Sequence, residues 1–355
     1  MATELRTSNA TTGAAPSELT TVDIDPEGDL LIDADFCRFR VCSNALRRQS
    51  PVWKQMLFGP WKEAKPTDGS AWIVEFPDDT ADPLHILLFI IHGKFDPVPP
   101  HPTVSRIHSI LILAHKYDIT GITRPWCSQW LQMASELNPT AANVVESLYI
   151  AWESGDEHLF ALRLEQISIQ ARIDSEGRLV YGENIVLEDE IHLGPQDVLE
   201  TISEIRMAFL GKLIARVHYS LEARMKEKPF CYFGGSYESK KICDAAAIGG
   251  IYRGMTQTIG GIPPRAVPDS KGSVVELASS LFSTMAQVPT THPGTRLCSP
   301  RFVFQHLNEG IHEDIPAVVT SFMKPEYKEY TAKQRLKTGV VLGTRQRTRY
   351  WKEVY

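Results

Sequence analysis

Three cysteines and one histidine in the second half of the chain have the side-chain types that bind a metal ion. They are Cys231, Cys243, His292 and Cys298. Three thiolates and a neutral imidazole would complete a tetrahedral structural zinc site. Their spacing matches no standard zinc finger, and the alternative is that the cysteines are small residues of a hydrophobic core. These four side chains are candidate ligands of one structural zinc ion, and a packed core is the alternative; the sequence indicates no other cofactor.

The sequence lacks the motifs that usually announce catalysis. No glycine-rich loop ends in Lys-Ser or Lys-Thr, and Gly249, Gly250 and Gly254 do not have the spacing of a dinucleotide-binding fingerprint. The stretch GGSYE has Glu238 where a nucleophile elbow needs glycine. HEDIP begins like a zinc-protease helix, but Pro316 occupies the position of the second histidine. We expect no enzymatic activity and no small-molecule substrate.

The composition is typical of an intracellular protein with two domains. The chain has 355 residues, 43% of them hydrophobic, and its net charge of -6 argues against a general nucleic-acid binder. The longest apolar run, LHILLFII, is too short to span a membrane. Six cysteines without a secretory signal indicate reduced thiols, so we expect a cytoplasmic or nuclear location.

The two ends of the chain differ from the rest in composition. Residues 324–355 contain nine Lys or Arg and three Glu. We predict a solvated basic tail over 326–355, with nuclear import or binding of an anionic partner as the alternative. Residues 1–24 have no apolar core and are predicted to be a flexible leader.

Strand and helix patterns follow one another between residues 25 and 135. Alternating apolar residues predict strands in GDLLIDADFCRFRV and AWIVEF, with Phe39, Val41 and Val74 facing the core. Ser50-Pro51 is a helix-start signal, and Gly93 ends a later helix. Helices are expected over 43–57, 82–92, 103–117 and around Trp126 and Trp130. Strands that come early and helices that accumulate later indicate an α+β domain.

Beyond residue 135 the pattern is almost entirely helical. Apolar spacing predicts a long helix after Gly194-Pro195, and Ser273 to Glu276 form a capping box that starts another helix. Residues 172–194 are polar, contain glycine and show no helical period, so we predict a loop. The predicted organisation is a leader over 1–24, an α+β domain over 25–135, a helical domain over 136–325 and a basic tail over 326–355.

The element order and motifs of residues 28 to 133 resemble a BTB/POZ domain. Gly28-Asp29 opens the first strand as the family's acidic residue does, and SPVWKQML matches its Ser-x-x-aromatic helix start. FRVCSNAL is similar to the family's Phe and Leu motif, with Cys42 in place of the family's histidine. LLFIIHGKFDPVP, LAHKYDITGITRPWCSQWL and, downstream, YIAWESGDEHLF resemble the form common in filamentous fungi. The resemblance implies a BTB/POZ-like domain, a small sheet with a helix cluster, followed by a mainly α-helical domain.

The same resemblance implies a function in non-covalent protein binding. Members of the family act as adaptors or scaffolds, so we expect a protein partner. The leading candidate partner is a cullin scaffold of a ubiquitin ligase, for which the helical domain would hold a substrate. The alternative is self-association with another BTB domain in transcription- or chromatin-linked regulation.

Phe95 and Asp96 are the candidate partner-binding residues. Phe95 follows the helix-ending Gly93, precedes a proline-rich segment and belongs to no apolar stripe. An aromatic side chain on a restricted loop docks with little loss of entropy. The alternative is that Phe95 folds back and caps the core. Helix-associated histidines are given no role in a site: His85, His92, His108 and His115.

Overall fold

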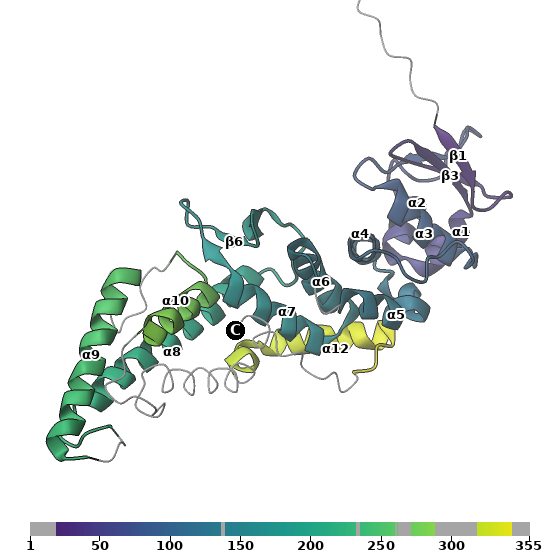
Figure 1. Cartoon of the computed structure of the whole chain (residues 1–355). Helices are drawn as coiled ribbons and strands as arrows, with labels where there is room; N and C mark the ends of the chain where they lie inside the picture. The colour runs from purple at the N-terminus through teal and green to yellow at the C-terminus, as the bar shows by residue number, and fades with distance from the viewer. Residues whose placement is uncertain are drawn as a thin grey trace, which may run out of the picture. The chain divides into compact units, whose positions relative to one another are not determined.

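The computed structural model describes residues 19–135, 139–231, 235–259, 261, 271–287 and 318–342. They form a mixed α and β structure, with a small sheet near the N-terminus and helices afterwards (Figure 1). The chain divides into two compact units. Unit 1 comprises the described residues up to Pro99 together with 112–122, and unit 2 comprises 100–111 and the described residues from Thr123 onward. The domain boundary at residue 135 stays a prediction.

Unit 1 is built on a four-stranded sheet. The strands are β1 Thr20–Asp23, β2 Leu30–Ala34, β3 Cys37–Val41 and β4 Ile73–Glu75. They lie in the order β1-β3-β2-β4, with β2 antiparallel to β3 and with β1 and β4 each parallel to its neighbour. The turn from β2 to β3 places Asp35 at φ 46°, which Asp tolerates better than most residues. The expected strand faces are confirmed, because Phe39, Val41 and Val74 are buried.

Short helices cover this sheet. They are α1 Ser43–Gln49, α2 Pro51–Phe58 and α3 Ala81–Ile91, together with the last part of α4 Val104–Lys116. The predicted start of α2 is confirmed, because Ser50 Oγ accepts the backbone N–H of Trp53 at 2.9 Å and Pro51 is the first helical residue. Trp53, Leu57 and Leu87 are completely buried and form the centre of the core.

Unit 2 is mainly helical. After the 3-10 turn η1 Thr120–Thr123, its helices are α5 Arg124–Ala134, α6 Ala141–Ser154, α7 Glu157–Gln170, α8 Val198–Met225, α9 Tyr237–Ile259, α10 Val274–Gln287 and α12 Pro325–Thr338. The capping box is confirmed, because Ser273 N donates to Glu276 Oε2 at 2.8 Å and Glu276 N donates to Ser273 Oγ at 3.0 Å. The predicted face of α8 is buried throughout: Val198, Ile202, Ile205, Phe209, Leu213, Val217 and Leu221.

The prediction of a loop over 172–194 is wrong, because this stretch contains a small antiparallel sheet. Its strands are β5 Arg172–Ile173, β6 Leu179–Tyr181 and β7 Ile185–Val186, followed by the 3-10 helix η2 Leu187–Asp189. Strands of two or three residues are too short to show an alternating pattern. The glycines that suggested a loop lie beside the strands, with Gly177 at φ 87° and Gly182 at φ 64°.

The predictions for the two chain ends are wrong in part. Residues 20–23 of the predicted leader form β1, which pairs Val22 with Phe39 of β3. Residues 326–338 of the predicted basic tail belong to α12. Neither segment shows an apolar period, because β1 is mostly exposed and the buried side chains of α12 are mostly polar.

Helix α12 packs against α6 (Figure 1). The two helices meet through aromatic and polar side-chain contacts. Tyr330 stacks on Trp152, with ring centroids 4.2 Å apart and an angle of 6° between the planes. The buried carboxylate of Glu153 accepts hydrogen bonds from Tyr330 Oη and Gln334 Nε2, both at 2.7 Å. The buried side chains of α12 recur at helical spacing: Tyr327, Thr331, Gln334 and Thr338.

Candidate functional site

The loop after α3 begins with a tightly hydrogen-bonded helix end. Gly93 has φ 70°, and its N–H donates to Ile90 O at 3.1 Å, while Lys94 N donates to Phe89 O at 2.9 Å. This pair of bonds is the Schellman motif, which a glycine in the left-handed region favours. The predicted helix end at Gly93 is confirmed. The motif fixes the direction in which the chain leaves α3 and enters the loop of residues 93–99.

His92 ties this helix end to the start of α1. Cys42 N donates to His92 Nε2 at 3.0 Å, and His92 Nδ1 lies 2.8 Å from Leu88 O. A backbone N–H can only donate, so Nε2 is the acceptor and the ring proton is on Nδ1, from which it is donated to Leu88 O. The imidazole is therefore neutral and singly protonated, and its geometry requires that form.

Asp29, the residue before β2, also holds the start of α1. Its two carboxylate oxygens accept the N–H and the hydroxyl of Ser43, each at 2.9 Å. Burial alone would raise the pKa of Asp29, but the bonds from Ser43 outweigh it and the pKa is lowered. A Cβ on Gly28 would lie 2.5 Å from Val41 O, so the residue before Asp29 must be glycine for the strands to approach this closely.

Phe95 lies on the loop of residues 93–99, which follows α3. Its side chain is 56% exposed and does not cap the core. Val98 N donates to Phe95 O at 3.0 Å, and Val98 is buried, so the loop is held after Phe95 as well as before it. Asp96 is exposed beside it, and Pro97 has a fixed φ. The loop presents an aromatic and a carboxylate side chain on restricted backbone.

Acidic solution is expected to weaken the contact between His92 and the start of α1. Burial lowers the pKa of His92; the bond to Leu88 O and the charge of Asp25 oppose this effect, and the charge of Lys94 adds to it. The folded state then favours the neutral imidazole, and its contribution to stability is present above the unfolded pKa and lost as the pH falls through the folded pKa. The free energy of unfolding, measured by urea titration, should fall more between pH 7.5 and 5.5 in the parent than in His92→Gln. The exposed His158→Gln is the control, and an equal pH dependence in all three proteins would contradict the prediction.

The predicted zinc ligands are described only in part. Cys231 and Cys243 are buried in one cluster, so the structure brings these two thiols together. Asp244 Oδ2 accepts Phe230 N at 2.8 Å, which holds the segment containing Cys231 near the start of α9. His292 and Cys298 lie outside the described residues. Among the described residues no group of three or more His, Cys, Asp and Glu is arranged to hold a metal ion, and the zinc site stays a prediction.

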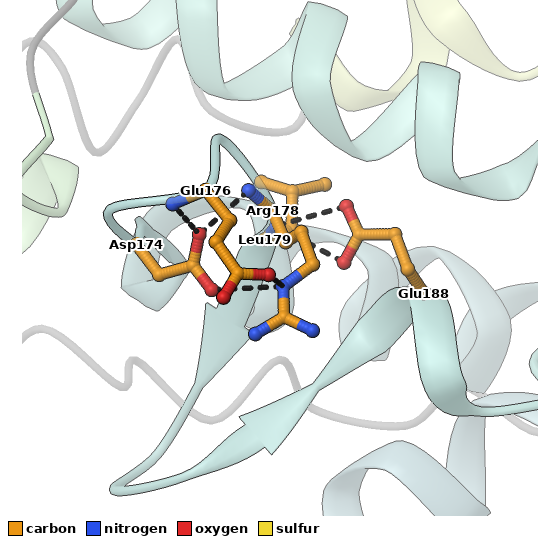
Figure 2. A network of polar contacts seen from close by, with 5 residues as sticks. All are labelled: Asp174, Glu176, Arg178, Leu179 and Glu188. Carbon is orange, nitrogen blue, oxygen red and sulfur yellow. Dashed lines mark hydrogen bonds and ion pairs between the residues drawn. The ribbon is translucent and has the colours of Figure 1, made fainter.

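A second polar network lies in the hairpin of β5 and β6 (Figure 2). Asp174 Oδ1 accepts Glu176 N and Arg178 N, both at 2.9 Å, and Oδ2 accepts Arg178 Nε at 2.9 Å. The backbone N–H of Arg178 is the main cause of the lowered pKa of Asp174. Both oxygens of Glu188 receive Leu179 N, at 2.9 and 3.1 Å. Asp174 holds the turn between β5 and β6, and Glu188 of η2 is bonded to the start of β6, so we interpret this network as structural.

The bond between His92 and Cys42 could not be read from the sequence. The usable signal was the position of His92, one residue before the helix-ending Gly93, where a side chain can turn back onto neighbouring backbone. Nothing in the local pattern indicates that this backbone belongs to the start of α1, 50 residues earlier.

Within the described residues, every helix is too short or too polar to cross a lipid bilayer.

Comparison with known proteins gave no relative: the chain matches no protein-family model, no curated protein and no solved structure.

Proposed function

We propose that this chain is a non-enzymatic adaptor or scaffold that binds a protein partner through a BTB/POZ-like first domain. The observation that carries the proposal is Phe95, 56% exposed on a loop whose backbone is hydrogen-bonded on both sides. An exposed aromatic side chain on restricted backbone loses little entropy on docking, and such residues often dominate protein interfaces. Asp96 beside it adds a charge that can select the partner.

A cullin scaffold of a ubiquitin ligase is the partner that we propose for the loop that carries Phe95 and Asp96. The alternative, a self-associating regulator linked to transcription or chromatin, relies more on the basic residues near the C-terminus. Two of those residues are engaged inside unit 2, where Lys324 pairs with Asp197 at 2.5 Å and Arg335 pairs with Glu157 at 3.5 Å. Their use in folding favours the adaptor over a role that depends on binding polyanions.

Phe95→Ala should remove the partner while leaving the fold intact. Affinity purification with quantitative mass spectrometry is expected to recover a cullin with the parent and much less of it with the variant. The melting temperature should barely move, because substitution of an exposed residue changes stability by about 0.5 kcal/mol or less. Phe36→Ala is the matched control, since Phe36 is 72% exposed in the turn between β2 and β3.

Two results would argue against the proposal. If Phe95→Ala melts normally and keeps every partner of the parent, Phe95 has no part in recognition. If chromatin proteins replace the cullin, and their recovery requires the basic C-terminal residues, the regulator is the better assignment.

A further inference from the structure

A second surface of unit 1 combines basic and aromatic side chains. Residues 43–70 contain five basic residues and two acidic ones, Glu63 and Asp68. The five basic residues are all exposed or partly exposed: Arg47, Arg48, Lys54, Lys62 and Lys65. On a chain whose net charge is -6, this segment is a local concentration of positive charge.

Two of these cations lie on aromatic rings in one continuous row. The guanidinium of Arg47 is 4.9 Å from the ring centroid of Phe58, and Phe58 meets Trp72 edge-on, with centroids 5.9 Å apart. Lys65 Nζ is 5.8 Å from the ring centroid of Trp72. Phe58 is 41% exposed, and Trp61, which follows it by three residues, is 57% exposed. We refer to Arg47, Phe58, Trp61 and Lys65 as the basic-aromatic surface.

The loop that carries Trp61 and Lys65 is held in place by hydrogen bonds. Trp72 Nε1 donates to Glu63 O at 2.8 Å, and Ala64 N donates to Trp61 O at 3.1 Å. A Cβ on Gly59 would lie 3.1 Å from Trp61 Cδ1, so the indole rests on the end of α2. The exposed indole is therefore preorganised, which lowers the entropy cost of docking.

The positive charge of this surface is incompletely neutralised within the described residues. Lys65 lies 3.6 Å from Asp29, and Lys62 lies 3.7 Å from Glu63. No carboxylate of the described part of the chain pairs with Arg47, Arg48 or Lys54. Unneutralised cations beside exposed aromatic side chains are complementary to carboxylates that flank an apolar group.

We propose that the basic-aromatic surface binds an acidic segment of a partner protein that carries one apolar anchor side chain. The anchor packs against Phe58 and Trp61, and flanking carboxylates pair with Arg47 and Lys65. The basic-aromatic surface and the Phe95 loop use different side chains, so each proposal can be tested and rejected without the other.

An acidic protein segment fits this surface better than a nucleic acid does. Single-stranded nucleic acids stack their bases on open aromatic faces. Here Arg47 lies over Phe58, Lys65 lies over Trp72, and Trp72 is buried. The exposed indole of Trp61 and the free edge of Phe58 leave room for one aliphatic or aromatic side chain, and the cations beside them suit carboxylates.

The test pans a displayed library of random dodecapeptides against the full chain and measures the enriched peptides by fluorescence anisotropy. Enriched peptides are expected to combine several Asp or Glu with one Trp, Phe or Leu. Arg47→Glu and Trp61→Ala should each weaken binding about tenfold or more, and Arg47→Lys should retain most of it. Lys333→Glu is the charge-matched control for Arg47→Glu, because Lys333 is exposed on α12, where it pairs with Glu329. Circular dichroism melting identifies any variant that fails to fold, in which case Arg47→Ala replaces Arg47→Glu.

Several results would overturn the proposal. It fails if no peptide is enriched, if enriched peptides are not acidic, or if Arg47→Glu and Trp61→Ala bind as the parent does. Tighter binding of an oligo-dT strand, lost in the same variants, would assign the surface to nucleic acid. A solution dimer lost in Arg47→Glu would assign it to a second copy of this chain. Phe95→Ala should bind the peptides normally, which separates this test from that of the proposed function.

Discussion

Replacement of Asp79 by alanine is expected to lower the stability of unit 1 by about 2–4 kcal/mol, because a buried hydroxyl and a lysine lose their shared partner. The Asp79 carboxylate is completely buried, and Lys116 Nζ lies 2.6 Å from its Oδ1. Its Oδ2 accepts a short hydrogen bond from Tyr117 Oη. Lys116 is partly exposed and can return to water, so most of the loss comes from the hydroxyl of Tyr117.

Tyr117 connects Asp79 to other elements of unit 1, so loss of Asp79 should affect more than one of them. Ser50, which caps α2, donates its hydroxyl to Tyr117 O at 2.7 Å, and the Tyr117 ring lies 4.5 Å from that of Trp53. Burial, and next the bond to Asp79, raise the pKa of the Tyr117 phenol. Tyr117, at the end of α4, is therefore bonded to the segment after β4 through its phenol and to the start of α2 through its backbone carbonyl and its ring. Loss of Asp79 should loosen all three.

Asp78→Ala is the matched control for Asp79→Ala. Asp78 is the preceding residue and is exposed, so its loss should change the free energy of unfolding by about 0.5 kcal/mol or less. Asp79→Asn keeps an acceptor of the same shape and should fall between the two. Urea titration gives all three values, and equal destabilisation by Asp78→Ala and Asp79→Ala would show that the buried network does not stabilise the unit.

Local pattern was sufficient to predict the elements that bury apolar side chains. Ser50-Pro51 and the capping box of Ser273 and Glu276 are start signals written in neighbouring residues, and each lies at the start of its helix. The long face of α8 follows from regular apolar spacing alone. These features need no knowledge of the partner element, because a buried face requires apolar residues whatever covers it.

The elements held by polar contacts could not be predicted in this way. Helix α12 presents Tyr327, Thr331 and Gln334 to the interior, and no hydrophobic period marks such a face. The site shows the same limit. Phe95 was found because it is an aromatic outside every stripe, whereas His92 acts through a bond to Cys42 that only the folded chain brings within reach.

Helix α12 packs closely against Gly155 at the end of α6. Gly155 ends α6 at φ 80°, a conformation that residues with a Cβ rarely adopt. A Cβ there would lie 2.5 Å from Thr331 O and would overlap the backbone N of Arg335. Arg335 Nε also donates to Gly155 O at 3.2 Å, and Thr338 Oγ1 donates to Ser154 O at 2.7 Å. The backbone of α12 therefore passes directly over the end of α6.

Gly155→Ala is accordingly expected to destabilise unit 2 by about 2–5 kcal/mol. Roughly 1–2 kcal/mol comes from placing alanine in the left-handed conformation, and roughly 1–3 kcal/mol comes from the overlap with α12. Gly177→Ala separates the two causes, because Gly177 has φ 87° and, apart from its own chain neighbours, the described residues place no atom within 4 Å of the position that a Cβ would take there. It should show the conformational cost alone, measured as the free energy of unfolding in urea. Hydrogen exchange should also show faster exchange in α12 for Gly155→Ala and not for Gly177→Ala. Equal losses in the two variants, with unchanged exchange in α12, would mean that α12 does not dock on Gly155 in solution.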